Sequence, residues 1–174
     1  MWGNLSAEVQ EGNFKSLARC ISLIENEVAG YETFLQSLPA SSTPIIGITG
    51  PPGAGKSTLV DSLIGLLVEQ DKKVAVLCVD PSSPFNLGAL LGDRIRMNAI
   101  GPWAGNGPKV FMRSLATRDS AQEVPATLPD IIALCRATGF DVVLIETPGI
   151  GQGDAAIVPH VDFSLYVMTP EYGA

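Results

Sequence analysis

The sequence of 174 residues lacks the features of several large classes of protein. It has 11 Lys and Arg against 18 Asp and Glu, and a net charge of −7 with a pI of about 4.6 argues against a nucleic-acid-binding surface. No apolar run approaches the length of a membrane span. The N-terminal segment carries more acids than bases, which fits neither a secretory signal nor a transit peptide. We therefore expect a soluble, cytoplasmic protein whose partners include neither nucleic acid nor a membrane.

Cysteine is also scarce, and the chain has no C-x-x-C pair. Cys20, Cys78 and Cys135 lie inside apolar periodic stretches, which is typical of buried free thiols in a reducing compartment and not of a metal site. Apolar residues, in contrast, make up 46% of the chain and charged residues 17%. A chain of this length and composition is expected to form one domain with a packed core.

The segment Gly50–Thr58 fills the phosphate-loop pattern G-x-x-x-x-G-K-[ST] at every fixed position. Its glycines lack a Cβ, so the backbone can bend around a phosphate chain and direct several N–H groups at it. Lys56 would place a charge on the β- and γ-phosphates, and Ser57 would offer its hydroxyl to Mg²⁺. A glycine turn that binds nothing is the far less favoured alternative. The expected nucleotide site comprises Gly50, Pro51, Pro52, Gly53, Ala54, Gly55, Lys56, Ser57 and Thr58.

The flanks of this loop have the expected character. Residues 45–49 form a short β-branched run typical of a buried parallel strand, and residues 59–68 form a broad apolar helical face. The positive end of that helix's dipole would then face the phosphates. Further elements are expected as follows: buried strands at 73–80, 141–147 and 163–168, a short strand at 109–113, and a helix at 129–137. This alternation predicts an α/β fold with a mostly parallel P-loop NTPase sheet and flanking helices.

Residues 1–44 stand apart from this alternation. Four apolar residues recur at helical spacing and predict a helix that starts near residue 12 or 13, namely Leu17, Ile21, Ile24 and Val28. A second short helix is expected at 31–38, followed by a Pro- and Ser-rich linker at 39–44. The predicted division is a small N-terminal helical extension with linker at 1–44 and a P-loop domain at 45–174. The extension either packs on a flank of the sheet or serves as a partner-binding arm.

Two of the expected strands end on a carboxylate, Asp80 and Glu146. Parallel sheets carry their ligands at the carboxyl ends of the strands, so both acids are expected near the phosphate loop. Either acid could instead cap the next helix. Glycine-rich stretches at 81–92 and 148–154 follow these strands and are candidates for segments that a γ-phosphate orders. Arg113 and Arg118 lie in the same region, either as solvated surface or as charge for phosphates or an acidic partner.

Three stretches carry a resemblance to a known family: Val79-Asp80-Pro81-Ser82-Ser83-Pro84, Leu91-Gly92-Asp93-Arg94-Ile95-Arg96-Met97 and Glu146-Thr147-Pro148-Gly149-Ile150-Gly151-Gln152. In these the chain resembles the MeaB/ArgK group of G3E-type P-loop GTPases, the chaperones of cobalamin-dependent acyl-CoA mutases. Residues 112–120 and 151–160 are most similar to the GTPase module of fused isobutyryl-CoA mutases.

The resemblance implies roles for individual residues. Glu146 and Gly149 match the E-x-x-G motif, so Glu146 would act through Mg²⁺ or its water shell and the Gly149 amide would lie near the γ-phosphate. Asp80 and Asp93 would belong to the magnesium and first-switch apparatus, and Gln152 would orient the attacking water. The implied metal set is Ser57, Asp80, Asp93 and Glu146.

The chain departs from the family pattern at two places. Leu87 stands where the family has a glycine in the first switch, which bears on the flexibility of that switch. No Asn-Lys-x-Asp motif, which reads guanine in such GTPases, occurs in the sequence. We therefore interpret the chain as a C-terminally truncated fragment of a protein that would form a homodimer at full length.

The leading interpretation is a GTP-hydrolysing chaperone that gates cofactor loading and protects an adenosylcobalamin-dependent acyl-CoA mutase. Lys56, Mg²⁺ and the loop amides would neutralise the leaving diphosphate. Two alternatives stay open: a P-loop kinase, for which no acceptor site is evident, and a nucleotide-dependent binding switch with little turnover. A partition ATPase is disfavoured because its extra lysine would occupy Pro51. We also hypothesise that Arg113 or Arg118 is a catalytic or coupling residue whose action is triggered by the mutase.

Overall fold

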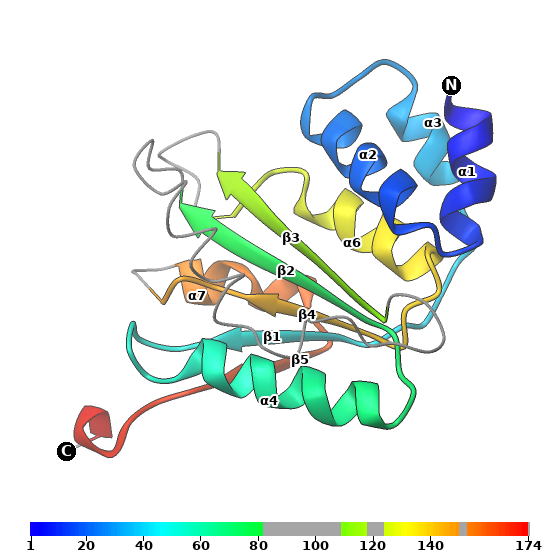
Figure 1. The fold of residues 1–174 in the computed structure, drawn as a ribbon. Helices are drawn as coiled ribbons and strands as arrows, with labels where there is room; N and C mark the ends of the chain where they lie inside the picture. The colour runs from blue at the N-terminus through cyan, green and yellow to red at the C-terminus, as the bar shows by residue number, and fades with distance from the viewer. Residues whose placement is uncertain (82–108, 118–123, 150–152, 174) are drawn as a thin grey trace.

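A sheet of parallel strands forms the centre of the computed structural model, which describes residues 1–81, 109–117, 124–149 and 153–173. Within these residues the sheet has five strands in the order β3-β2-β4-β1-β5, and every neighbouring pair is parallel. The carboxyl ends of the strands therefore meet at one edge of the sheet (Figure 1). The strands are β1 (Ile45–Thr49), β2 (Val74–Pro81), β3 (Val110–Thr117), β4 (Val142–Glu146) and β5 (Phe163–Tyr166).

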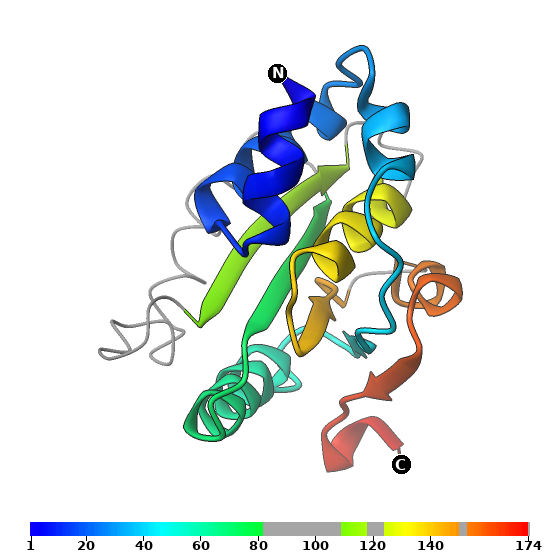
Figure 2. The ribbon, with the colours of Figure 1, turned by 90° about the vertical axis from the view of Figure 1, so that its right-hand side faces the viewer.

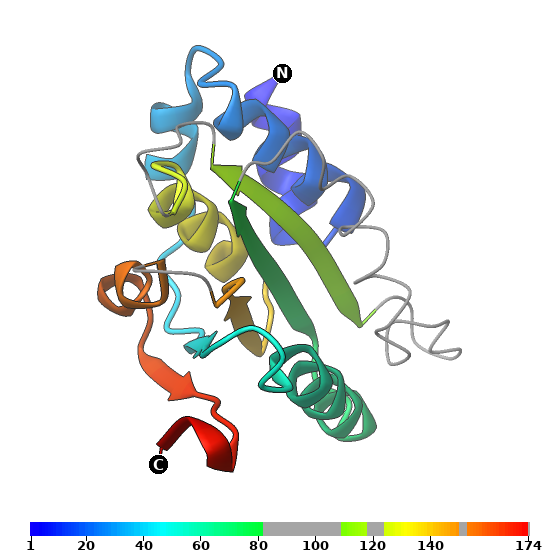
Figure 3. The same ribbon diagram turned by 90° about the vertical axis from the view of Figure 1, so that its left-hand side faces the viewer.

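Helices cover both faces of this sheet (Figures 2 and 3). On one face lies α4 (Lys56–Glu69), whose Val60, Ile64 and Val68 pack in one buried cluster with Ile48 of β1 and Val76 of β2. The other face carries α1 (Trp2–Gln10), α2 (Phe14–Glu25), α3 (Tyr31–Gln36) and α6 (Leu128–Ala137). Three short elements complete the described chain: α7 (Gly153–Ala156), η2 (Val158–His160) and η3 (Pro170–Gly173).

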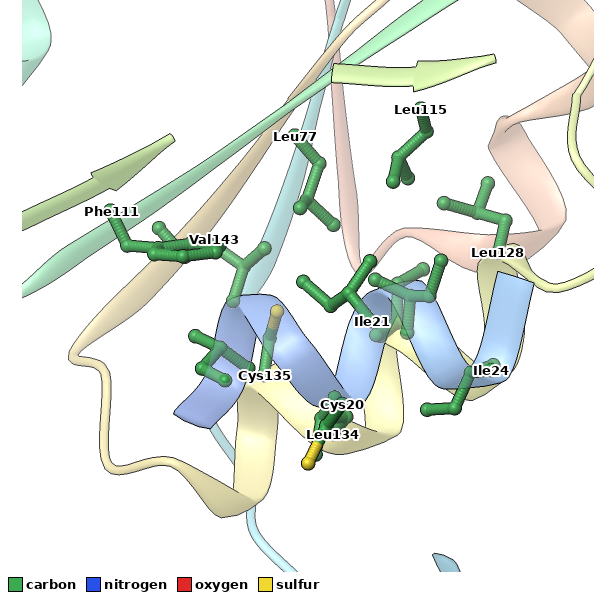
Figure 4. Packing of buried hydrophobic residues seen from close by; sticks show 14 of the residues in the cluster. Cys20, Ile21, Ile24, Leu77, Phe111, Leu115, Leu128, Leu134, Cys135 and Val143 are labelled. Carbon is green, nitrogen blue, oxygen red and sulfur yellow. The ribbon is translucent and has the colours of Figure 1, made fainter. Parts of the chain in front are cut away.

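The larger hydrophobic cluster joins α2 and α6 to the sheet (Figure 4). Leu17, Ile21 and Ile24 of α2 are fully buried, and burying each such side chain contributes roughly 1.5–3 kcal/mol. Two cysteines belong to this cluster, and burial raises the pKa of the Cys20 thiol to about 11 and that of Cys135 to about 12. All three cysteines are free, as expected, but Cys78 was expected to be buried and is only half-buried.

Defined contacts hold the N-terminal helices to one another and to the sheet, where Phe14 of α2 packs edge-on against Phe111 of β3 with ring centroids 5.7 Å apart. Asn13 caps α2, because its side-chain oxygen accepts hydrogen bonds from the backbone N–H groups of Lys15 and Ser16. Trp2 stacks on Phe34 with ring centroids 4.7 Å apart and donates to the Ala29 carbonyl. The extension thus packs on a flank of the sheet. The division at residue 44 stays a prediction.

The predicted α/β class with a parallel sheet is confirmed, and so are the expected strands and the helix at 129–137, to within a few residues at their ends. Two expectations need correction. β3 extends to Thr117, well past the expected residue 113. β5 was expected to be buried, but all four of its residues are exposed, because among the described residues it is an edge strand with a partner, β1, on one side only. Within the described ranges, no helix is both long and apolar enough to cross a membrane.

Candidate functional site

The loop after β1 adopts a backbone that only glycine accepts easily. Gly50, Gly53 and Gly55 have φ values of +134°, +78° and +95°, in the left-handed region that other residues enter at a cost of roughly 1–2 kcal/mol. A Cβ placed on Gly53 or Gly55 would meet no atom within 4 Å. A Cβ on Gly50, in contrast, would lie 2.0 Å from the Val167 carbonyl oxygen, just after β5. The loop is therefore anchored at its start and open at its middle.

Lys56 lies across this loop as the first residue of α4. Only 6% of its surface is exposed, and its Nζ donates hydrogen bonds to the Gly50 carbonyl at 2.7 Å and the Pro51 carbonyl at 2.9 Å. A buried ammonium needs such partners because its desolvation is costly. The structure therefore holds one positive charge inside the loop, next to the amides that form it.

Ser57 and Glu146 meet beside the loop. Ser57 Oγ donates a 2.7 Å hydrogen bond to Glu146 Oε1, and Glu146 is 9% exposed at the end of β4. The parallel register pairs Glu146 with Ile48 of β1, which brings the carboxylate to the strand that leads into the loop. A hydroxyl and a carboxylate are hard oxygen donors of the kind Mg²⁺ prefers. Among the described residues, no three His, Cys, Asp or Glu side chains are grouped closely enough to hold a metal by themselves.

Gly149, three residues after Glu146, rests directly on the loop. Its φ is +76°, and a Cβ at this position would lie 2.0 Å from the Gly50 carbonyl oxygen and 2.5 Å from Lys56 Nζ. The Thr147 N–H donates to the Ile48 carbonyl at 3.1 Å, so the chain leaves β4 still bonded to β1. The E-x-x-G segment and the phosphate loop are therefore in contact, and only glycine fits at Gly149.

The remaining residues predicted for the site are placed as follows. Asp80 lies in β2, where the register pairs it with Ala116, but its side chain is not among the parts described. Asp93, Arg118 and Gln152 lie outside the described residues. The structure thus brings together Lys56, Ser57, Glu146 and Gly149, and the roles of the other residues stay predictions.

Arg113 lies away from this group, on β3, which β2 and β4 separate from β1. Arg113 lies two residues from both Phe111 and Leu115, so the three side chains point to the same face of the sheet, which α2 and α6 cover. Its Nη2 donates to Glu25 Oε2 at 2.8 Å and to Ser22 Oγ at 2.9 Å, both on α2. Its Nε is buried with no hydrogen-bond partner among the described atoms. In this structure, Arg113 connects β3 to the N-terminal extension.

Sequence reasoning missed two contacts that surround the site. One is the Val167 carbonyl against Gly50, which no local pattern indicates. The other is Ile157 against Gly47, in the middle of β1. A glycine inside a β-branched strand was the available signal for this contact, because it often marks a close approach by another segment.

A glycine loop between a buried strand and a helix, with an internal lysine and a Ser–Glu pair beside it, defines the class: a P-loop nucleotide-binding protein. The chain belongs to the MeaB family, because the family model described as Methylmalonyl Co-A mutase-associated GTPase MeaB matches residues 17–174.

Individual relatives agree with this assignment. The chain is 53% identical over 172 residues to a fused isobutyryl-CoA mutase of Cupriavidus metallidurans, a match that covers 95% of this chain and 15% of that protein. It is 46% identical over 175 residues to a fused isobutyryl-CoA mutase of Geobacillus kaustophilus, covering 94% of this chain and 16% of that protein. It is 32% identical over 160 residues to the GTPase ArgK of Escherichia coli, covering 88% and 47%. The chain thus spans a small part of the fused mutases and about half of ArgK.

Proposed function

We propose that this chain is the nucleotide-binding part of a GTP-hydrolysing chaperone for an adenosylcobalamin-dependent acyl-CoA mutase. In this role it gates cofactor loading and protects the loaded enzyme. The observation that carries the proposal is the convergence of Lys56, the Ser57–Glu146 pair and Gly149 on one glycine loop. The names of the family and of the fused relatives support the choice of GTP and of a mutase as partner.

The chain's own residues fit binding and positioning of a triphosphate. The N–H groups of the loop and the N-terminus of α4 bind phosphate oxygens, and Lys56 exchanges its carbonyl partners for the β- and γ-phosphates. Ser57 and Glu146 would hold Mg²⁺, directly or through its water shell. When bound, Mg²⁺ neutralises charge on the β- and γ-phosphate oxygens. The Gly149 amide would contact the γ-phosphate, which the close approach of Gly149 to the loop supports.

The attack of water on the γ-phosphate needs little covalent chemistry from the protein. Catalysis of this kind is mostly positioning and charge stabilisation. Glu146 is nine-tenths buried, so its orientation is fixed by Ser57 and by the pairing of β4 with β1. Gln152 is proposed to orient the water, and Asp80 and Asp93 are proposed to complete the magnesium apparatus. We further propose a cytoplasmic location and a homodimer at full length.

The deciding experiment uses full-length protein with γ-labelled GTP, with and without a cognate acyl-CoA mutase. We expect slow release of free phosphate that the mutase accelerates, and weaker competition by ATP than by GTP. Label transferred to a small molecule or a protein would replace this proposal with a kinase. Tight binding with no phosphate release, with or without the mutase, would replace it with a nucleotide-dependent switch.

A further inference from the structure

Gly47 is a glycine in the interior of a buried strand, where a residue with a side chain would normally stabilise the sheet. Its φ is not among the positive ones, so backbone conformation does not require glycine there. The reason is space: a Cβ on Gly47 would lie 2.8 Å from Ile157 Cδ1, and 3.2 and 3.3 Å from the two γ-carbons of Val161. The segment around Ile157 therefore packs directly against β1 at Gly47.

Ile157 fixes the end of α7 on the sheet. It follows α7 directly, is fully buried, and belongs to the cluster that contains Ile45 and Ile145. The chain after it stays attached to β1, because the Asp162 N–H donates to the Ile45 carbonyl at 2.9 Å. The segment that leads into β5 is thus held on β1 by side-chain packing and by a backbone hydrogen bond.

The connection from β4 to β5 touches the β1–loop segment at two glycines. At its beginning Gly149 lies against Gly50, and further along Ile157 lies against Gly47. Both contacts are too close for a Cβ on the glycine without a shift of the partner. Gly47 pairs with Ile145, the residue before Glu146, and lies three residues before Gly50. Because protein interiors are close-packed, a displacement of β1 at Gly47 is transmitted to both Glu146 and Gly50.

We propose that Gly47 and Ile157 are positioning residues for nucleotide hydrolysis, which hold α7 on β1 and thereby keep Glu146 and Gly149 in register with the phosphate loop. Neither residue lies in the loop itself, so each acts through β1 and its pairing with β4. This inference rests on the proposed function. It predicts that disturbing the contact lowers the rate of hydrolysis and leaves the binding of diphosphate to the loop intact.

The test is a compensating pair of substitutions in the full-length protein. Gly47→Ala introduces a methyl group against Ile157 Cδ1, and Ile157→Val removes that same carbon. We expect Gly47→Ala to lower kcat for GTP about tenfold, since misplacement by an ångström or less can cost up to about 100-fold. The Kd for GDP should stay within about twofold. The double variant should recover most of the lost kcat.

Gly65→Ala is the matched control, because Gly65 lies on α4 and an added Cβ there meets nothing within 4 Å. It should leave kcat unchanged. Unchanged kcat in Gly47→Ala, an equal loss of GDP affinity, or a double variant that folds but does not recover would each overturn the proposal.

Hydrogen exchange at residues 153–161 gives a readout that does not depend on turnover. Exchange there should be faster in Gly47→Ala, near normal in the double variant, and unchanged in Gly65→Ala. If Gly47→Ala does not fold, Ile157→Val alone loosens the same contact, and unchanged exchange in that variant overturns the inference. If the wild-type protein releases no phosphate, both the proposed function and the positioning role are refuted. Hydrogen exchange would then still show whether Gly47 and Ile157 are in contact.

Discussion

Ser57 Oγ lies 2.7 Å from Glu146 Oε1, so the first turn of α4 and the end of β4 meet although 89 residues separate them in the chain. The contact joins the last fixed position of the phosphate loop to the first position of the E-x-x-G motif. Two side chains that the sequence assigned separately to a magnesium ion thus lie within hydrogen-bonding distance of each other.

Substitution of either member of this pair is expected to separate hydrolysis from binding. Ser57→Ala and Glu146→Gln should each lower magnesium-dependent GTP hydrolysis by about tenfold or more, because groups that hold or orient a metal are typically worth 10–100-fold. Binding of GDP without magnesium should change little. Turnover and calorimetry with GDP in EDTA measure the two quantities. An equal loss of both in either variant would assign that residue a purely structural role.

Gly149 is expected to tolerate no side chain. Gly149→Ala should abolish most hydrolysis, because its Cβ would lie 2.0 Å from the Gly50 carbonyl oxygen, a backbone atom. Gly139→Ala is the matched control: its φ is +82°, close to the +76° of Gly149, but an added Cβ there meets nothing within 4 Å. Both variants pay a similar conformational cost of roughly 1–2 kcal/mol. Equal GTPase activity in the two variants would contradict the contact with the loop.

The sequence was sufficient to predict the parts of the fold that depend on local patterns. The motif at Gly50–Thr58, the β-branched strands and the helix at 129–137 are read from spacing and residue type, and the structure agrees with them. Contacts between distant segments were not accessible in this way. Two such contacts are the pairing of Arg113 with Glu25 and the packing of Ile157 against Gly47. They depend on strand order and on helix packing, which no single segment encodes. The exposure of β5 likewise follows from its position at the edge of the sheet, not from its apolar residues.

Arg113 is expected to contribute to stability through Glu25. Arg113→Ala should lower the free energy of unfolding by about 1–3 kcal/mol, because the Glu25 carboxylate, whose side chain is 17% exposed, loses a charged partner 2.8 Å away. Arg19→Ala, which removes an exposed arginine on α2, should change the free energy of unfolding little. A double-mutant cycle with Glu25→Gln measures the coupling, and additive effects would contradict it.

Arg113→Ala also tests the hypothesis of a mutase-triggered role. If the mutase stimulates hydrolysis by this variant as much as by the wild type, the role of Arg113 is limited to the ion pair.

Asp162 is expected to make stability depend on pH. The backbone N–H of Ile45 and, in addition, the guanidinium of Arg136, both at 2.8 Å, lower the pKa of its carboxyl. The stability that this carboxylate provides is therefore complete above its unfolded pKa of about 3.9 and lost as the pH falls through the lower folded value. At pH 7, Asp162→Asn should have a lower melting temperature than the wild type, and this difference should disappear in strongly acidic solution. A difference in melting temperature that does not vary with pH would contradict this role. Glu69→Gln, at an exposed site, should have the melting temperature of the wild type.

Removal of the Lys56 ammonium tests most directly whether Gly50–Thr58 binds a nucleotide. Lys56 is the one charged side chain of the loop, and charge-assisted phosphate contacts are strong. Calorimetry with GTP and GDP on full-length protein is therefore expected to show at least a ~100-fold loss of affinity in Lys56→Ala, equivalent to about 2.7 kcal/mol. Lys15→Ala, at an exposed position on α2, should bind as wild type does. Lys56→Ala with wild-type affinity and wild-type turnover would contradict the assignment of this site.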